Sequence, residues 1–334
     1  DYDIAEEIIR IYGYDIYDNI NYSLFANSKV TEGQHHPRLA LERKFRNALV
    51  QRGFYENISY SLVSPTSVEK LRLNDIRANL IKIANPITED ISCMRTSLAH
   101  SLLTNISYNN SVGNKECAIF ECGRIYLTDK LPLTELPLEK NILAIAVNKE
   151  NFDFYNLKGI VDNLLSQTSL KYDIVRSNEP YLHPGISADI ITDGKVVGSF
   201  GKIHPMVAKN YDLQPNVYYG EIDTGYLAML EPKKYISKQI SKFPIVERDL
   251  AVVVDESVTA KEMLDLVKSS CGNLYYDASL FDIYRSNSLG QNKKSMGFKI
   301  KLSSLNKTLT DEEVNKVMQK ILKTFNYKFG AVLR

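Results

Sequence analysis

Apolar residues follow two different spacings along the chain, and each spacing predicts one kind of secondary structure. Leu98, Leu102 and Ile106 recur at the three-to-four-residue spacing of a helix with one apolar face. The segment 118–126 then predicts a buried strand, whose glycine, Gly123, would let another backbone come close. With a strand before the helix as well, this stretch predicts the centre of an antiparallel α+β domain.

The pattern of the other residues up to position 222 predicts more elements of the same domain. Pro37 suits the first turn of a helix, and Asp193-Gly194 is a strong hairpin signal between two strands. The predicted helices span residues 37–53 and 157–165, and the predicted strands span 55–63, 142–147, 187–192, 196–203 and 218–222.

Three of the five histidines directly precede a proline, and a fourth, His35, precedes His36. We predict a tight turn at His183-Pro184-Gly185 and the end of a strand at His204-Pro205, because no nucleophile-and-base arrangement surrounds either pair. His35 and His36 could be metal ligands, but adjacent side chains diverge and no third ligand is nearby in the sequence. A pair of surface residues at the start of a helix is the favoured interpretation.

The last hundred residues predict a second domain. Thr259 and Thr310 each precede a glutamate by three residues, which is the spacing of a capping box that opens a helix. The predicted strands span 248–254, 274–284, 295–302 and 331–333, and the predicted helices span 259–270 and 310–325. The order β-α-β-β-α-β is the split pattern of a ferredoxin-like domain, in which two helices cover one face of a sheet and leave the other free.

Composition indicates a soluble protein. The chain has 334 residues, 44% hydrophobic and 24% charged, which predicts two or three domains, and no apolar run reaches the length of a membrane span. Cys93, Cys117, Cys122 and Cys271 lack the CxxC spacing of a zinc site, so we expect reduced packing residues. The chain begins at Asp1 and has no signal peptide, so we expect a cytoplasmic protein and a piece of a longer chain.

Positive charge gathers towards the C-terminus. The whole chain has a net charge of +1, whereas residues 241–334 hold fifteen Lys and Arg against eleven Asp and Glu, a net charge of +4. Single-stranded RNA is bound by aromatic side chains that stack on bases and by cations that contact phosphates. The candidate RNA-binding residues are Arg248, Tyr284, Arg285, Lys293, Lys294 and Arg334. A solvated face with no RNA role stays open as the alternative, because the charge excess is mild.

Carboxylates cluster at the N-terminus, in a predicted amphipathic helix over residues 3–12. Asp3 and Glu6 have the spacing of a capping box, and Glu6 and Arg10 form a favourable i,i+4 pair, so a capped and solvated helix is one interpretation. The other is a divalent-cation site, since Asp3, Glu6 and Glu7 are hard oxygen ligands close together.

Six motifs, in order along the chain, resemble the beta subunit of bacterial phenylalanine-tRNA ligase. They are Asn85-Pro86, Met94-Arg95-Thr96-Ser97-Leu98, the segment 120–126, the segment 153–159, Leu182-His183-Pro184-Gly185 and the segment 198–205. The last domain is similar to the C-terminal anticodon-binding domain of the same subunit, through Phe243-Pro244, Arg248-Asp249, Phe281-Asp282, Tyr284-Arg285, Lys294-Ser295, the segment 309–313 and Leu333-Arg334.

This resemblance implies three regions: the end of a B5-type domain at 1–25, a class II synthetase-like antiparallel core at 34–230, and the ferredoxin-like anticodon-binding domain at 241–334. It implies a magnesium site at Asp3, Glu6 and Glu7, shared with an alpha subunit, with a further acidic ligand before Asp1. It also implies a cytoplasmic heterotetramer with the alpha subunit, which uses ATP, and binding of tRNA(Phe). The editing domain and the additional N-terminal tRNA-binding domain of the family are not in this chain.

The core lacks residues that adenylation requires. Where a catalytic relative would place arginines after Tyr126, the chain has Leu127-Thr128-Asp129-Lys130, and the segment 219–223 has one glycine and no arginine. Without cations the developing charge on pyrophosphate has no electrostatic partner. We therefore predict a non-catalytic core in which Arg95 and Arg124 pair with carboxylates such as Glu121. A self-sufficient adenylating enzyme and an interaction scaffold with no RNA role are the rival hypotheses.

Overall fold

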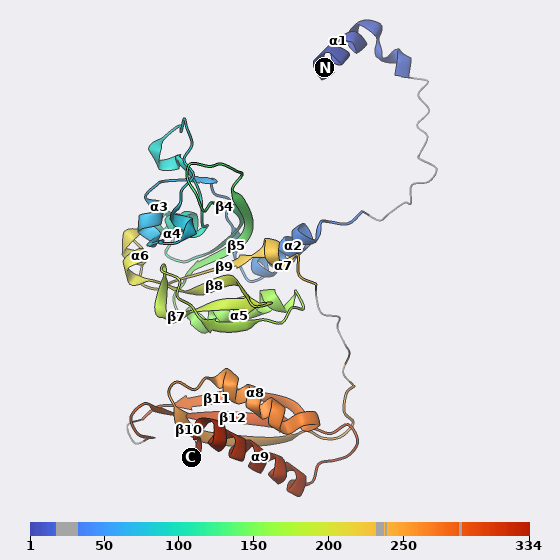
Figure 1. Cartoon of the computed structure of the whole chain (residues 1–334), viewed down its shortest axis with the longest axis vertical. Helices are drawn as coiled ribbons and strands as arrows, with labels where there is room; N and C mark the ends of the chain where they lie inside the picture. The colour runs from blue at the N-terminus through green and yellow to red at the C-terminus, as the bar shows by residue number, and fades with distance from the viewer. Residues whose placement is uncertain (18–32, 232–236, 238, 287–288) are drawn as a thin grey trace. The chain divides into compact units, whose positions relative to one another are not determined.

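A computed structural model describes residues 1–17, 33–231, 237, 239–286 and 289–334 (Figure 1). The chain divides into two compact units, residues 1–234 and 235–334, and each is described by itself. The predicted boundary at 231–239 lies mostly outside the described residues.

A seven-stranded sheet forms the centre of the first unit. Two strands of eleven residues each, β4 and β5, have alternating or continuous apolar character and pair in register over their whole length. All neighbours are antiparallel except β1 and β4, which are parallel, so the sheet is mixed rather than purely antiparallel. In spatial order the strands are β1 (Tyr55–Glu56), β4 (Cys117–Leu127), β5 (Leu138–Asn148), β9 (Val217–Asp223), β8 (Lys195–Ile203), β7 (Leu182–Thr192) and β6 (Asp173–Arg176).

Helices cover both faces of this sheet because successive strand residues point to opposite sides. In β5, Ala144 and Ala146 face a core built with α3 (Ser67–Leu71), α4 (Ala99–Ser111) and α6 (Pro205–Asn210). Leu143 and Ile145 face a second core built with α2 (Pro37–Val50), α5 (Phe154–Ser166) and α7 (Thr224–Leu227). Figure 1 shows these two groups of helices on either side of the sheet.

The prediction of one strand over residues 55–63 is wrong. Only its two ends are strands: β1 belongs to the large sheet, and β2 (Leu62–Val63) pairs with β3 (Cys93–Met94) in a separate two-stranded sheet. Asn57 N donates to the Phe120 carbonyl of β4 at 2.7 Å, and the backbone leaves the large sheet after this bond. The strand expected before α4 is therefore β3, which lies outside the main sheet.

The predicted turn at His183-Pro184-Gly185 is also wrong, since these residues lie within β7. The pairing of β7 with β8 is irregular between Leu182 and Ser187, and the His183 ring accepts a hydrogen bond from the Gly185 amide at 3.1 Å. His204 ends β8 as expected, and in addition its ring accepts from Met206 N at 3.1 Å to cap α6. Both His-Pro pairs thus shape the backbone.

The N-terminal helix α1 (Tyr2–Tyr12) begins one residue earlier than the sequence suggested. Asp1 is its N-cap and makes no side-chain cap bond, so the predicted Asp3–Glu6 capping box is wrong. Arg10 pairs with Glu6 at 2.5 Å, as predicted, and also with Glu7 at 2.8 Å. A short 3-10 helix, η1 (Tyr14–Tyr17), follows, and two others are η2 (Ile76–Ala78) and η3 (Glu89–Ile91).

The second unit has the predicted ferredoxin-like fold. Its strands β10 (Val246–Asp255), β11 (Tyr275–Tyr284), β12 (Lys293–Leu302) and β13 (Val332–Leu333) form an antiparallel sheet in the order β11-β12-β10-β13. Both predicted capping boxes are present: Thr259 and Glu262 open α8 (Ala260–Cys271), and Thr310 and Glu313 open α9 (Asp311–Phe329). The two helices lie together on one side of the sheet in Figure 1, and η4 (Gly272–Leu274) follows α8.

Candidate functional site

The face of the C-terminal sheet turned away from the helices is the candidate nucleic-acid interface. Leu250, Val252 and Val254 of β10 are buried against α8 and α9, so the alternate residues Ala251 and Val253 lie on the other side, the free face. The register of β12 places Lys293, Ser295, Gly297, Lys299 and Lys301 on that free face as well.

Tyr284 and Arg334 meet on this free face. The Arg334 guanidinium lies 4.7 Å from the centre of the Tyr284 ring, a cation–π distance, although two strands separate their backbones in the sheet. The Arg334 amide donates to the Ala251 carbonyl at 3.1 Å, which fixes the end of the chain against β10. Ala251 pairs with Gly297 across β10 and β12, so two small residues lie on the free face beside the Arg334 backbone.

A second aromatic ring lies on the same floor of small residues. Phe281 covers Gly297 so closely that a Cβ built on that glycine would stand 2.9 Å from the ring. Phe281 is 56% exposed and Tyr284 is 43% exposed, so both present aromatic surface to solvent. Phe281 is not among the predicted RNA-binding residues, because only the β11 bulge between Leu280 and Asp282 turns it to this face.

Three of the six predicted RNA-binding residues already have partners within the unit. Arg248 lies on the helix-covered side of β10 and pairs with Asp311 at 2.7 Å. Arg285 pairs with Glu256 at 2.6 Å, and this hydrogen bond lowers the pKa of that carboxyl. Lys294 is buried and donates to the Glu256 carbonyl at 2.7 Å. Lys293, exposed on the free face, joins Tyr284 and Arg334 there.

The free face has mixed charge. Glu247 lies between Lys299 and Lys301, with nitrogen–oxygen distances of 3.8 and 3.3 Å, and Asp249 and Asp255 share the same side of β10. The net charge of +4 in the sequence therefore does not gather into a cationic surface here. Any RNA contact at this face depends on aromatic surface and on individual cations rather than on a broad positive field.

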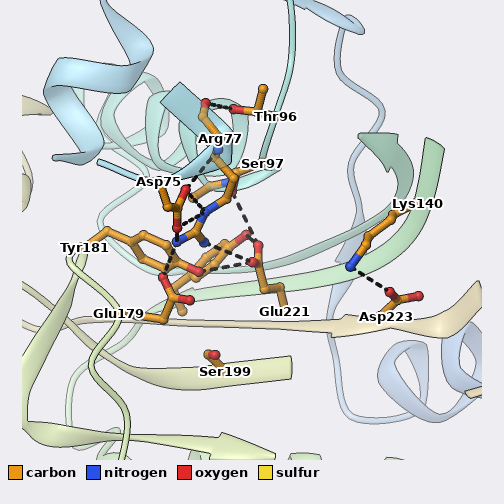
Figure 2. A network of polar contacts seen from close by, with 12 residues as sticks. Asp75, Arg77, Thr96, Ser97, Lys140, Glu179, Tyr181, Ser199, Glu221 and Asp223 are labelled. Carbon is orange, nitrogen blue, oxygen red and sulfur yellow. Dashed lines mark hydrogen bonds and ion pairs between the residues drawn. The ribbon is translucent and has the colours of Figure 1, made fainter. Parts of the chain in front are cut away.

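The core of the first unit contains a polar network centred on Arg77, which the sequence analysis missed (Figure 2). Arg77 Nη2 pairs with Asp75 at 2.6 Å and with Glu179 at 2.8 Å, and the guanidinium lies 5.5 Å from the centre of the Tyr181 ring. Burial raises the pKa of Glu179, and the charge of Arg77 opposes that rise. No sequence signal could link Arg77 to Glu179, because 102 positions separate them.

Glu221 anchors the other half of this network. Its two oxygens accept hydrogen bonds from Tyr181 at 3.0 Å and Tyr219 at 2.8 Å, and burial, followed by the charge of Glu221, raises the pKa of both phenols. Ser97 donates to the same carboxylate at 3.3 Å. The network thus lies between the sheet and the loop that precedes α4.

The predicted structural role of two arginines is confirmed. Arg95 pairs with Glu121 at 2.6 Å in a fully buried site, and Arg124 pairs at 2.5 Å with Glu139, an exposed neighbour on β5. With Arg77 also engaged by carboxylates, these three arginines of the core are all neutralised by acidic partners.

The N-terminal carboxylates do not form a complete metal site within this chain. Asp3, Glu6 and Glu7 are exposed on α1, and Arg10 engages two of them. Over the described ranges, from residue 1 to 334 with their gaps, no three His, Cys, Asp or Glu side chains are grouped so as to hold a metal ion. The residues present therefore do not fit magnesium without further ligands.

Comparison with known proteins first shows the class of protein to which this chain belongs. A family model described as "Ferredoxin-fold anticodon binding domain" matches residues 241–334, and one described as "Phenylalanyl tRNA synthetase beta chain CLM domain" matches residues 23–224. A synthetase-type α+β core followed by an anticodon-binding domain is the architecture of an aminoacyl-tRNA synthetase subunit. The chain belongs to the phenylalanyl-tRNA synthetase beta chain family.

Individual relatives align with nearly the whole of this chain. The phenylalanine-tRNA ligase beta subunit of Clostridium tetani is 37% identical over 340 residues, and that of Clostridium acetobutylicum is 34% identical over 339 residues. Each alignment covers 99% of this chain and 42% of the relative, so the chain spans less than half the length of these proteins.

Among solved structures, a pyrrolysyl tRNA synthetase of Desulfitobacterium hafniense matches with a TM-score of 0.47 and 17% identity, over 57% of this chain and 67% of that one.

Among the residues that the structure describes, none of the helices combines the length and apolar character needed to cross a bilayer.

Proposed function

We propose that the chain is the C-terminal portion of a phenylalanine-tRNA ligase beta subunit, which supports a catalytic alpha subunit and binds the tRNA anticodon. In this proposal, residues 1–25 end a B5-type domain, residues 34–230 are the non-catalytic core, and residues 241–334 bind tRNA. The assembled protein would be a cytoplasmic heterotetramer that attaches phenylalanine to tRNA(Phe) with ATP. Membership of the beta chain family over 99% of the chain supports this role.

The exposed aromatic pair on the free face, together with the family match of its domain, is the observation that best supports RNA binding. Tyr284 and Phe281 can each stack on an unpaired base, a contact worth ~1 to 3 kcal/mol per base. Arg334, held over Tyr284, would place its charge beside the phosphate of a stacked nucleotide. Lys293 offers a second cation on the same face.

Measuring the affinity of the full chain for tRNA(Phe) with and without this aromatic surface tests the proposal. We expect Tyr284→Ala to weaken binding about tenfold or more at fixed salt, because one stacking contact is lost. Tyr327→Ala is the matched control, since Tyr327 is 93% exposed on α9 and lies outside the free face. Equal affinities of the two variants would refute the role of Tyr284, and no binding by the parent chain would favour a scaffold without an RNA role.

The engagement of Arg77, Arg95 and Arg124 by carboxylates supports a core without adenylating activity. A charged oxygen of ATP would have to displace a carboxylate to reach Arg77 or Arg95, and at Arg95 it would leave the buried carboxylate of Glu121 unpaired. We expect no phenylalanine-dependent exchange of pyrophosphate into ATP by this chain alone. Exchange above the background of a heat-denatured sample would favour the adenylating alternative.

Exposed apolar residues beside the edge strand β1 support association with an alpha subunit. Tyr55, Ile58 and Tyr60 are 77%, 93% and 78% exposed, and Tyr55 belongs to β1, a short strand at the edge of the large sheet. Mixing the chain with the alpha subunit should give a complex of defined mass. Ile58→Asp should weaken that complex, whereas Ile240→Asp, a change at a 90% exposed residue of the other unit, should leave it intact.

The carboxylates of α1 would contribute to a magnesium site only with ligands from outside this chain. Asp3 lies in the first turn of the helix, and Glu6 and Glu7 would have to exchange Arg10 for the cation. Magnesium binding at these residues stays a prediction, to be tested on the alpha–beta complex rather than on this chain.

A further inference from the structure

A cleft of about 230 Å³ lies on the large sheet beside the Arg77 network, and no role described so far uses it. Strands β4, β5, β8 and β9 form its floor, and residues from the segment 75–77 and Glu179 line its rim. Figure 2 shows Lys140 and Asp223 at one side of this region, well separated from the Arg77 cluster.

The inner charges of the cleft already have partners. Arg77 is shared by Asp75 and Glu179, and the Glu221 oxygens each accept a tyrosine hydroxyl. Ser199, also in the lining, donates to Asp189 at 2.7 Å. These groups offer little hydrogen-bonding capacity to a ligand.

Lys140 and Asp223, in contrast, keep hydrogen-bonding capacity for a ligand. The distance from Lys140 Nζ to Asp223 Oδ2 is 3.6 Å, which is longer than a hydrogen bond. The other oxygen of Asp223 accepts the Tyr226 amide at 2.8 Å and caps α7, so this carboxylate is held in place. One cation and one fixed carboxylate oxygen thus lie side by side in the cleft, each able to make further hydrogen bonds.

The rest of the lining is apolar and the space is small. Ile125, Leu127 and Ile142 lie on the same side of the sheet as the charge pair, and Val196 of β8 adds apolar surface to the lining. If each heavy atom takes the ~30 Å³ of a liquid water molecule, the cleft has room for roughly eight of them. A ligand that fits would have one positive and one negative group close together on a small apolar body.

We propose that this cleft binds a small apolar α-amino acid as the free zwitterion. The ammonium group contacts Asp223, the carboxylate contacts Lys140, and the side chain packs against Ile125 and Ile142. Charge-assisted hydrogen bonds of this kind provide the recognition, and no chemical step is involved. The cleft lies wholly within the first unit, whereas the residues proposed to contact RNA belong to the second.

Three probes of nearly equal size test the proposal on the full chain. L-valine has both charged groups, isobutylamine lacks the carboxylate, and 3-methylbutanoate lacks the ammonium. In calorimetric or NMR titrations we expect saturable binding of L-valine in the millimolar range, and weaker binding of each analogue by about tenfold or more, since each loses one charge-assisted contact. No saturation with L-valine, or equal binding of either analogue, would overturn the proposal.

Matched variants locate the site. Asp223→Asn keeps a good helix cap but removes the negative charge, and Lys140→Gln removes the positive one. Both should lower the affinity for L-valine about tenfold or more, whereas Glu139→Gln, beside Lys140 but paired with Arg124, should not change it. Unchanged affinity in the first two variants, with thermal unfolding like that of the parent chain, would place any binding elsewhere and refute the assignment.

Discussion

Arg95 Nη1 lies 2.6 Å from Glu121 Oε1, and both side chains are almost fully buried, with 5% and 3% of their surface exposed. The second oxygen of Glu121 accepts hydrogen bonds from Asn57 at 2.8 Å and Ser59 at 2.6 Å. Arg95 Nε donates to the Arg124 carbonyl at 2.8 Å. The pair therefore joins β4 to the loop between β1 and β2, which no strand pairing holds.

Removing one partner of this pair should destabilise the core strongly. Arg95→Met leaves the Glu121 carboxylate buried without its cation, and such a change costs about 3 to 5 kcal/mol. Urea unfolding followed by circular dichroism measures the loss. Arg124→Met is the control: its exposed pair with Glu139 should cost under about 1 kcal/mol. Similar losses in the two variants would contradict the importance of burial.

Gly123 makes room for the Arg95 side chain. A Cβ at Gly123 would lie 2.4 Å from Arg95 Nη2 and 3.1 Å from a Leu98 methyl group, and hydrogen bonds prevent the guanidinium from moving away. Gly123→Ala should therefore lower the free energy of unfolding by about 1 to 3 kcal/mol, the usual cost of overpacking.

Gly159 provides the comparison for this change, because it lies in α5 and an added Cβ there has no neighbour within 4 Å. Gly159→Ala should be neutral or stabilise the protein by up to about 1 kcal/mol through helix propensity. A stable Gly123→Ala variant would show that the core repacks around the methyl group.

The capping boxes of the second unit should each contribute measurably to its stability. Thr259→Ala and Thr310→Ala remove the hydroxyls that accept from Glu262 N and Glu313 N, at a cost of about 1 kcal/mol each. Thr324→Ala, in the middle of α9, removes a hydroxyl with no capping role and should be near neutral. Thermal unfolding ranks the three variants by stability. A loss of stability in Thr324→Ala equal to that in the two capping variants would contradict this prediction.

His100 should make the first unit less stable in mild acid. Burial, with a smaller effect of Lys70, lowers its pKa from 6.5 to about 4, and its Nδ1 lies 2.7 Å from the Tyr211 hydroxyl. Because the folded state holds the neutral ring, the unfolded state binds more protons below pH 6.5. The stability from His100 is present above that pH and is lost progressively as the pH falls towards 4, at ~1.4 kcal/mol per pH unit.

Urea unfolding at several pH values between 6.5 and 5 measures this slope. His100→Gln keeps a polar side chain that does not titrate, so its stability should fall less steeply over that range than that of the parent chain. Parallel slopes for the two proteins would mean that the ring is already protonated in the folded state or does not titrate there.

Much of the second unit could be predicted from the sequence. The capping boxes at Thr259 and Thr310 involve residues three positions apart, and the burial of Leu250, Val252 and Val254 follows from the two-residue period of a strand. The helices α4 and α5 were predictable for the same reason. Such local patterns do not depend on which distant segments of the chain come into contact.

The predicted RNA-binding residues show that local patterns are not sufficient to predict which face of the sheet a side chain occupies. Arg248 and Lys294 are as cationic as Arg334, but the register of β10 and β12 turns them to the helix-covered side, where Asp311 and the Glu256 carbonyl bind them. The bulge in β11 brings Phe281 to the free face in their place. Register depends on pairing between strands, which no short window of sequence contains.

The sequence by itself determined most of the helices and strands, their order and the family, because each of these depends on neighbouring residues or on motifs in succession. Only the tertiary structure decided the partners: Arg77 with Glu179, Lys140 with Asp223, and Tyr284 with Arg334. The reason is physical, since long-range ion pairs and ring contacts form wherever packing of the apolar cores brings side chains together. That packing is a property of the whole domain and is absent from any single stretch of it.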